Sequence, residues 1–175
     1  MPRPVPLTPL RTERLDLAAP CEADLPRMIE LADDAQVARM LAALPHPYAE
    51  ADARFFLEKL LPGRSTWAIR LRGDGFIGMI GLHEEAHGAV NMGYWLGRPY
   101  WRRGYMGEAA AAVVGHARRS GLDRLSAGYW RDNAASARIL ARLGFEKTGE
   151  RRLDHPLRGK AAPHVDTALR LDRPA

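Results

Sequence analysis

The sequence has little of several features that would point to particular classes of protein. It holds a single cysteine, Cys21, among 175 residues. One cysteine cannot form an internal disulfide or a cysteine-based zinc cluster, which fits a reducing environment. Long apolar runs are missing as well, and the first ten residues are broken by prolines and contain no apolar block of signal-peptide length. These absences predict a cytoplasmic protein without a membrane-spanning segment.

Acidic residues are the minority among the charged ones. The chain has 26 Lys and Arg against 21 Asp and Glu, a net charge of +5 and a pI of about 9.8. The basic residues are spread along the chain with only short doublets such as Arg118–Arg119, so they do not form the basic stripe of a nucleic-acid-binding protein. A phosphate-rich cofactor or an acidic partner protein would equally favour a positive surface. We therefore do not expect nucleic acid as a partner.

The hydrophobic pattern predicts one domain over residues 1–175, since no repeat, low-complexity tract or linker divides the chain. Predicted strands and helices alternate along much of it, with a polar loop at 154–163 near the end. The fold class is therefore α/β (α+β), with a mixed, mostly antiparallel central sheet of about seven strands flanked by helices. The predicted strands are 14–19, 67–71, 76–82, 91–96, 124–129, 146–152 and 164–171, and the predicted helices are 23–31, 35–41, 49–61, 108–119 and 134–143.

The most informative segment is Pro-Tyr-Trp-Arg-Arg-Gly-Tyr-Met-Gly-Glu-Ala at residues 99–109. It follows one predicted strand and opens a predicted helix, so its free backbone N–H groups lie at the positive end of the helix dipole, an arrangement that binds phosphate. Arg102 and Arg103 can add charge-assisted hydrogen bonds. Gly104 and Gly107 let the backbone approach a ligand closely. A plain structural turn is the alternative interpretation.

A second segment, Asn-Ala-Ala-Ser-Ala-Arg-Ile-Leu-Ala-Arg-Leu-Gly-Phe at residues 133–145, lies downstream. Asn133 is the predicted N-cap of a helix, with Ser136 in its first turn. Together with Gly93-Tyr94-Trp95 and the turn at 99–109, this segment resembles the acyl-CoA-binding motifs of the GNAT N-acetyltransferase superfamily. The match to P-x-W-x-x-G-Y-x-x-E-A, then N-x-x-S-x-x-x-L-x-x-L-G-F, is most similar to the RimJ/RimL-like branch, and it extends upstream to residues 10–15.

The resemblance implies acetyl-CoA as co-substrate and a primary amine as acceptor, on a protein N-terminus or a small molecule. Acetyl would pass directly between them, with Cys21 playing no part as a carrier, and a homodimer is compatible with the family. Ser136 would lie near the CoA sulfur and could donate a proton to the departing thiolate. The cofactor-binding residues implied are Gly93, Tyr94, Trp95, Leu96, Arg102, Arg103, Gly104, Tyr105, Met106, Gly107, Asn133 and Ser136.

Two departures from the family pattern concern the chemistry. Met106 stands where the family has a small residue, with Gly107 one place later, so a Met side chain would crowd the pyrophosphate unless it points into the core. Asn91 and Met92 stand where an acidic residue often precedes Gly-Tyr, and Asn cannot act as a general base. This leaves a non-catalytic acyl-CoA-binding or sensing domain as an alternative function.

Candidates for the general base come from the segment after the neighbouring predicted strand, His83-Glu84-Glu85-Ala-His87. This segment also matches H-E-x-x-H, a zinc-hydrolase pattern that requires both His on one helical face. Apolar strands lie tightly on both sides of it, so we predict a loop and no metal. A zinc hydrolase using His83 and His87 is the second alternative function.

Overall fold

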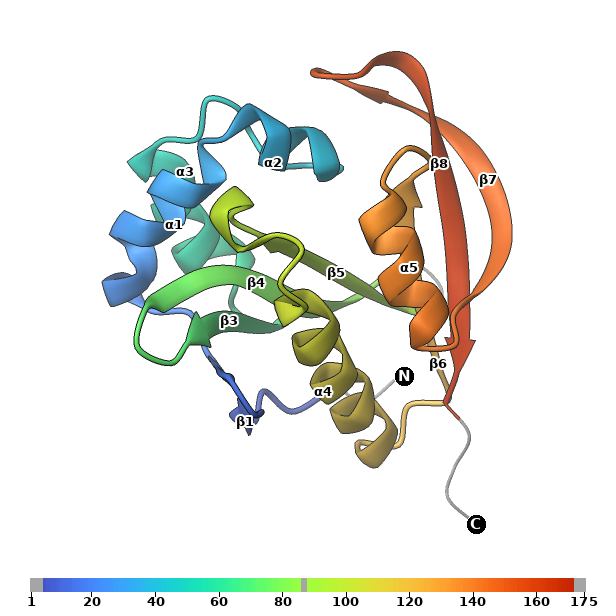
Figure 1. The fold of residues 1–175 in the computed structure, drawn as a ribbon, viewed down its shortest axis with the longest axis horizontal. Helices are drawn as coiled ribbons and strands as arrows, with labels where there is room; N and C mark the ends of the chain where they lie inside the picture. The colour runs from blue at the N-terminus through green and yellow to red at the C-terminus, as the bar shows by residue number, and fades with distance from the viewer. Residues whose placement is uncertain (1–4, 86–87, 172–175) are drawn as a thin grey trace.

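The computed structural model describes residues 5–85 and 88–171, and its centre is one eight-stranded sheet (Figure 1). The strand order is β1-β2-β3-β4-β5-β6-β8-β7, and within the described residues every neighbouring pair is antiparallel except β5 and β6. The strands are β1 (Leu10–Arg11), β2 (Leu15–Ala18), β3 (Ser65–Leu71), β4 (Gly75–Glu84), β5 (Val90–Leu96), β6 (Arg124–Trp130), β7 (Glu146–His155) and β8 (Gly159–Arg170).

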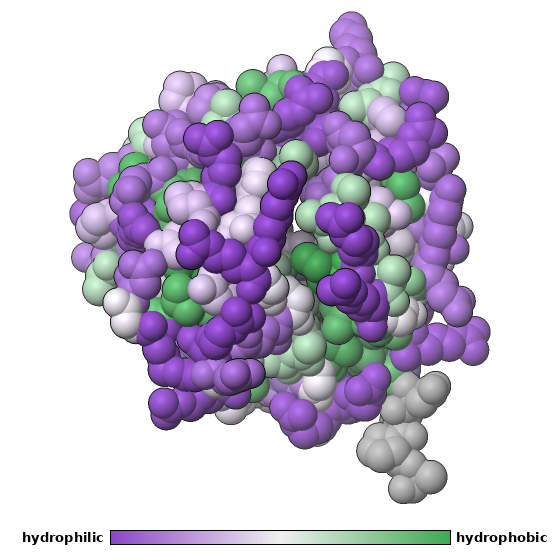
Figure 2. Space-filling model, in the orientation of Figure 1, coloured by the Kyte–Doolittle hydropathy of each residue, from purple (hydrophilic) through white to green (hydrophobic). Residues whose placement is uncertain are grey.

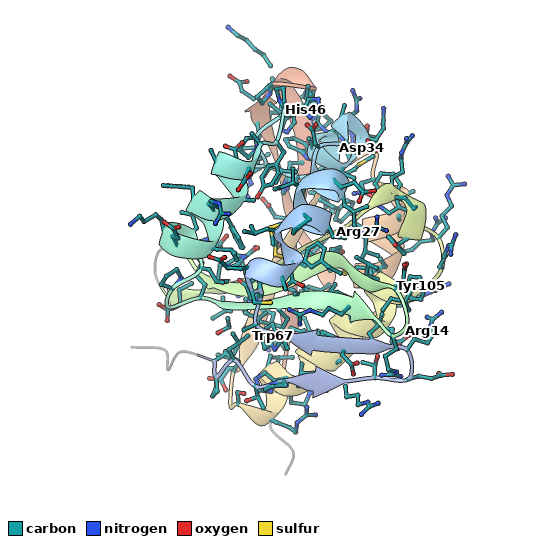
Figure 3. All side chains as sticks on the ribbon, turned by 90° about the vertical axis from the view of Figure 1, so that its left-hand side faces the viewer. Arg14, Arg27, Asp34, His46, Trp67 and Tyr105 are labelled. Atoms are coloured by element: carbon teal, nitrogen blue, oxygen red, sulfur yellow. The ribbon has the colours of Figure 1, made fainter. Side chains whose placement is uncertain are left out.

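Helices cover both faces of this sheet (Figures 1 and 3). Helix α1 packs on one face, where a Cβ at Gly97 would lie 2.6 Å from Leu31. Helix α4 packs on the other, where the rings of Trp67 and His116 are 5.6 Å apart. We call these the α1 face and the α4 face. The helices are α1 (Leu25–Ala32), α2 (Ala35–Met40), α3 (Glu50–Phe55), α4 (Tyr105–Arg119) and α5 (Ala134–Arg142), the last lying on the α4 face.

Coverage on both sides explains the apolar composition of the central strands. Residues 76–82 of β4 are all buried, because alternate side chains lie on the α1 face and on the α4 face and helices cover both faces. Trp67 and Ile80, partners across β3 and β4, are fully buried on the α4 face. The resulting core is continuous from β2 through β6 and holds the central strands rigidly.

The fold class is confirmed, with three differences in detail. The short β1 brings the sheet to eight strands rather than about seven. The predicted polar loop 154–163 is mostly strand, because β7 runs to His155 and β8 begins at Gly159. The predicted helix 49–61 ends as α3 at Phe55 and continues as one π-helical turn, Phe56–Leu60. Within the described part of the chain, no helix is long and apolar enough to cross a membrane.

Candidate active site

Strands β5 and β6 run parallel and then part. Their pairing is registered at one position, Asn91 opposite Ser126, where Asn91 Nδ2 donates to Ser126 Oγ at 3.2 Å. β5 is otherwise held by β4 along its whole length, and β6 is held by β8. The two strands therefore diverge toward their carboxyl ends, and α4 and α5 follow at that same end. Ligands of α/β proteins bind at such a point, outside the carboxyl ends of parallel strands.

Asn91 thus has a structural role at the closed end of this gap. Its amide bonds Ser126, whose hydroxyl donates in turn to Val90 O at 3.3 Å. This side-chain pair joins the two strands where their backbones still meet. The position that often carries an acidic residue in the family serves here as a strand junction, so a proton acceptor has to come from elsewhere.

The turn between β5 and α4 is held open by two left-handed residues. Gly104, the N-cap of α4, has φ 81°, and Arg102 has φ 61°, which is uncommon for a residue with a side chain. The first hydrogen bond of the helix runs from Glu108 N to Gly104 O at 3.1 Å. Among the described residues, the N–H groups of residues 102–107 donate to no other protein group. Such a cluster of free amides at a helix N-terminus is an anion site.

Side chains from distant segments fix this turn in place. Trp101 Nε1 donates to Leu96 O at 2.8 Å, which ties the turn to the end of β5. The buried Tyr100 hydroxyl accepts from Arg27 of α1 and donates to Asp74 in the β3–β4 turn. The turn is therefore anchored to a helix and a hairpin before any ligand binds, which lowers the cost of binding.

Met106 and Glu108 each have a clear structural position. The Met106 side chain is buried in the core, so it does not crowd the turn, while a Cβ at Gly107 would meet nothing within 4 Å. Glu108 accepts from the Thr12 hydroxyl and from both Arg14 N and Arg14 Nε. Burial alone would raise the pKa of Glu108, but these hydrogen bonds and the Arg14 charge outweigh it and hold the pKa below its usual value. Glu108 fastens the β1–β2 turn to α4 as a carboxylate and is not placed as a base.

Arg14 is a candidate site residue that the motifs did not reveal. Its Nη1 donates to Arg103 O at 3.0 Å, and its Nη2 lies 3.4 Å from where a Cβ on Gly104 would be. Its guanidinium also stacks over the Tyr105 ring at 4.5 Å. A third cation, after Arg102 and Arg103, therefore stands beside the anion turn. Its only sequence signal is its place in the stretch at residues 10–15 that matched the family start.

The first turn of α5 faces β5 across the gap on the α4 face. Asn133 caps the helix as predicted, because its Oδ1 accepts from Ser136 N at 3.1 Å. The buried Tyr94 hydroxyl has no hydrogen-bond partner of normal geometry among the described residues, although Ser136 lies near it. Burial raises the pKa of Tyr94 to about 12, with Ser136 acting in the opposite direction. Apolar side chains gather between α4 and α5 on this face, bordered by polar ones (Figure 2).

His83 lies on the other side of the sheet, on the α1 face. Its ring extends over two paired strand glycines, since a Cβ on Gly81 would lie 2.7 Å from His83 Cε1 and a Cβ on Gly93 would lie 3.7 Å from Nε2. The Nδ1 atom is buried without a partner among the described residues, as is the nearby Thr66 Oγ1. Burial, and secondly the charge of Arg64, lowers the pKa of His83, so the imidazole is neutral at pH 7.

The other predicted base candidates are placed differently. Glu84 and Glu85 are exposed, and Glu84 pairs with Val90 at the closed end of the gap. His83 and Glu84 belong to strand β4 rather than to the predicted loop or to the helix that the zinc pattern needs, and His87 lies outside the described residues. Within residues 5–85 and 88–171 no group of three or more His, Cys, Asp or Glu side chains could hold a metal ion.

The fold and the site define an α/β domain with an anion-binding turn beside an open pair of parallel strands. Residues 14–146 match the family model described as the acetyltransferase (GNAT) domain, which is more than half of the chain. The chain therefore belongs to the GNAT acetyltransferase family, as its motifs predicted.

Curated relatives and solved structures agree with this assignment. The chain is 37% identical over 82 residues to the ribosomal protein uS5 alanine N-acetyltransferase of Escherichia coli, covering 46% of this chain and 42% of the relative. It is 37% identical over 87 residues to the uncharacterized N-acetyltransferase YoaA of Bacillus subtilis, covering 47% of this chain and 49% of the relative. The matches thus span about half the length of these curated relatives or less.

Two solved structures share the fold over nearly the whole chain. A GNAT-family acetyltransferase from Bacillus anthracis superposes with a TM-score of 0.82 at 22% identity, covering 94% of this chain and 99% of the other. The ribosomal-protein acetyltransferase RimL, in complex with coenzyme A, superposes with a TM-score of 0.81 at 20% identity, covering 97% and 99%. At these identities the likeness establishes the fold.

Proposed function

We propose that this protein is an acetyl-CoA-dependent N-acetyltransferase that moves an acetyl group directly to a primary amine, on a protein N-terminus or a small molecule. The observation that carries the proposal is the parting of β5 and β6 beside a turn of unpaired amides. This arrangement offers a phosphate site on the α4 face and an opening through the sheet to the α1 face. A cofactor with a phosphate end and a long acyl-bearing arm matches that shape.

The cofactor would be held by backbone groups more than by side chains. The amides of residues 102–107 would bind the pyrophosphate, assisted by Arg14 and by Arg102 or Arg103. The pantetheine arm would lie between β5 and the first turn of α5, against Tyr94 and Asn133. Backbone N–H groups among residues 93–96 would then bind the thioester oxygen as it gains negative charge.

The chemistry needs a neutral amine, and His83 is the best-placed base. An alkyl ammonium is largely protonated at pH 7, so it must first lose a proton. His83 is neutral there and its Nε2 faces the space above Gly93, on the side of the sheet opposite the phosphate turn. Glu84 and Glu85 are exposed carboxylates at the closed end of the gap, and we assign the base to His83 in preference to them.

The transfer then proceeds in one ternary complex. The amine nitrogen attacks the thioester carbon, the C–N bond forms, and the C–S bond breaks as the tetrahedral intermediate collapses. The second amine proton leaves with this step and passes through the Ser136 hydroxyl to the departing thiolate, so one proton goes to His83 and one to the CoA thiol. Because a thiol has a pKa of about 8.5, its thiolate is already a fair leaving group, so Ser136 assists rather than enables the step.

A panel of amines tests this function, with release of free CoA thiol as the readout. An N-terminal alanine peptide belongs in the panel because the E. coli relative is named for that acceptor, together with a polyamine, an aminoglycoside and an amino acid amide. Turnover of one of them that His83→Gln abolishes or slows would support the proposal. Tight CoA binding without turnover of any amine would instead identify a non-catalytic acyl-CoA-binding domain.

A further inference from the structure

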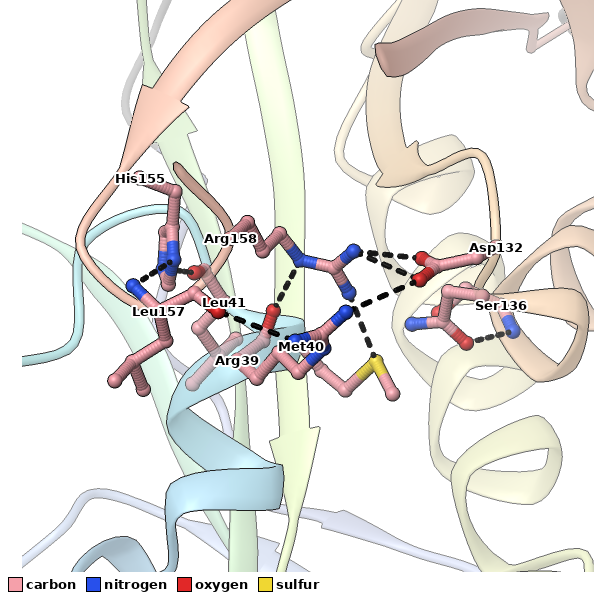
Figure 4. A network of polar contacts seen from close by, with 9 residues as sticks. Arg39, Met40, Leu41, Asp132, Ser136, His155, Leu157 and Arg158 are labelled. Atoms are coloured by element: carbon pink, nitrogen blue, oxygen red, sulfur yellow. Dashed lines mark hydrogen bonds and ion pairs between the residues drawn. The ribbon is translucent and has the colours of Figure 1, made fainter. Parts of the chain in front are cut away.

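The Arg158 guanidinium joins three segments that are separate in the sequence (Figure 4). It extends from the tip of the β7–β8 hairpin, and its Nη1 donates to both carboxylate oxygens of Asp132 at 2.8 and 2.9 Å. Its Nε donates to Arg39 O, in α2, at 2.7 Å. The guanidinium carbon lies 4.8 Å from the centroid of the fully buried Trp130 ring. Only 6% of the Arg158 side chain is exposed, so this is a buried cation with every side occupied.

Two further contacts fasten the same hairpin tip to α2. Arg39 Nη1 donates to Leu157 O at 3.1 Å, and His155 Nε2 lies 2.9 Å from Leu41 O. Helix α2 also contacts β5. The hairpin tip and α2 therefore form one connected wall, reaching from β5 to the turn after β6, the two strands that border the gap.

From Asp132 the contacts continue into the cofactor side of the site. Asp132 directly precedes Asn133, whose side chain caps α5 by accepting from Ser136 N. Ser136 in turn lies near the buried Tyr94 hydroxyl on β5. A continuous path thus leads from the hairpin tip, through the Arg158–Asp132 ion pair and one helix cap, to the strand that would hold the acyl group. Arg39 Nη2 also lies 3.9 Å from Asp132 Oδ2, so α2 adds a second, longer ion pair to the same carboxylate.

We infer that Arg158 is a positioning residue that couples the α2–hairpin wall to the first turn of α5, so that cofactor binding orders α2 and the hairpin tip. The inference rests on the proposed function, because it assigns CoA to the gap. A buried charge is tolerated only while its partners stay in place. Displacement of α2, the hairpin tip or the Asp132 turn would leave the buried guanidinium without one of its partners. The positions of the three segments are therefore coupled. Lysine cannot replace it, because an ammonium lacks the planar fork that reaches a carboxylate and a carbonyl at once.

Amide hydrogen exchange with and without coenzyme A tests this coupling without requiring a known acceptor. In the unmodified protein, coenzyme A should slow exchange at residues 102–107, at 133–137, and also at 39–41 and 155–158. In Arg158→Lys, residues 102–107 should still be protected, whereas protection at 39–41 and 155–158 should vanish. The Kd for coenzyme A should rise about fivefold or more, the lower end of typical coupling between sites.

Arg151→Lys is the matched control, because Arg151 belongs to the same hairpin but pairs with Asp166 inside it and is 56% exposed. That variant should behave like the unmodified protein in both measurements. Asp132→Asn breaks the same ion pair from its exposed side, together with the longer Arg39–Asp132 pair, and serves if Arg158→Lys does not fold. Protection at 102–107 without any at 39–41 and 155–158 in the unmodified protein would overturn the coupling and leave the proposed function standing. Equal distant protection in Arg158→Lys would also overturn it, and failure of coenzyme A to bind would overturn both.

Discussion

Two glycines with the same backbone conformation, one at each end of α4, allow the anion turn to be tested against a matched control. Gly104 precedes the helix and Gly121 follows it, and both have φ 81°. A Cβ at Gly121 would meet nothing within 4 Å, and one at Gly104 would meet only Arg14 Nη2 at 3.4 Å. Alanine at either position is therefore not excluded by crowding, and its main cost is the left-handed conformation, about 1–2 kcal/mol.

We expect Gly104→Ala and Gly121→Ala to lower the free energy of unfolding by similar amounts. For a domain of this size, each kcal/mol corresponds to about 2–4 °C in Tm. Only Gly104→Ala should weaken coenzyme A binding, because relief of the strain rotates the free amides of the turn away from the pyrophosphate. Losing one such hydrogen bond to a charged group costs about 1.5–3 kcal/mol, so Kd should rise at least about tenfold.

Calorimetric titration with coenzyme A gives the two affinities, and thermal unfolding gives the two stabilities. The difference between the variants removes the shared cost of the left-handed residue. If both folded variants bind coenzyme A as tightly as the unmodified protein, the phosphate does not lie against residues 102–107 and the proposed cofactor site is wrong.

Three further changes test the catalytic assignments once an acceptor is known. If His83 is the base, its neutral form is the active one, and because burial lowers its pKa, kcat/KM should fall only as the pH drops below about 6.5. Arg64→Gln removes a nearby cation and should move that fall to higher pH, whereas an unchanged profile would remove His83 as the base. Ser136→Ala keeps the helix cap, because the cap uses the Ser136 backbone N–H, and it should lower kcat by about 10²-fold or less with little change in KM for acetyl-CoA. An effect on KM alone would make Ser136 a binding contact. Gly81→Ala places a Cβ 2.7 Å from the His83 ring and should lower both the activity and, by about 1–3 kcal/mol, the free energy of unfolding. Gly149→Ala, whose Cβ would meet no atom within 4 Å, should change neither, and full activity in Gly81→Ala would mean that the ring need not lie over that glycine.

Features that depend on neighbours in the sequence were predictable. The turn at 99–109 and the cap at Asn133 were visible because a strand, a glycine turn and a helix follow one another within a few residues. Helix α5 begins at Ala134 as predicted, whereas α4 begins at Tyr105, three residues before the predicted start at 108. The family followed from the same local spacing.

Features that depend on distant contacts were not predictable. Arg14 reaches the turn through a pairing with Glu108 that spans 94 positions. Strands 146–152 and 164–171 were predicted, but the β7–β8 hairpin tip at 154–163 was predicted as a polar loop, since Pro156, Gly159 and Pro163 interrupt it. Its register also shifts between Leu153 and His155, and a two-residue period cannot anticipate such a shift. The Arg158 contacts depend on that register, so no pattern in the sequence predicted them.

The open pair of strands also accounts for why the proposed base and the proposed phosphate site lie on opposite faces. Past Asn91, the edge of β5 that faces β6 has no strand to pair with, and backbone groups left unpaired inside a protein are costly. An extended ligand with amide groups of its own can lie along that edge, passing from the anion turn on the α4 face toward Gly93. His83 reaches the same glycine from the α1 face, separated by the sheet from Arg14 and the other cations of the turn. In the proposed mechanism the neutral base would thereby be kept away from the charges assigned to the phosphate, which would otherwise depress its basicity further.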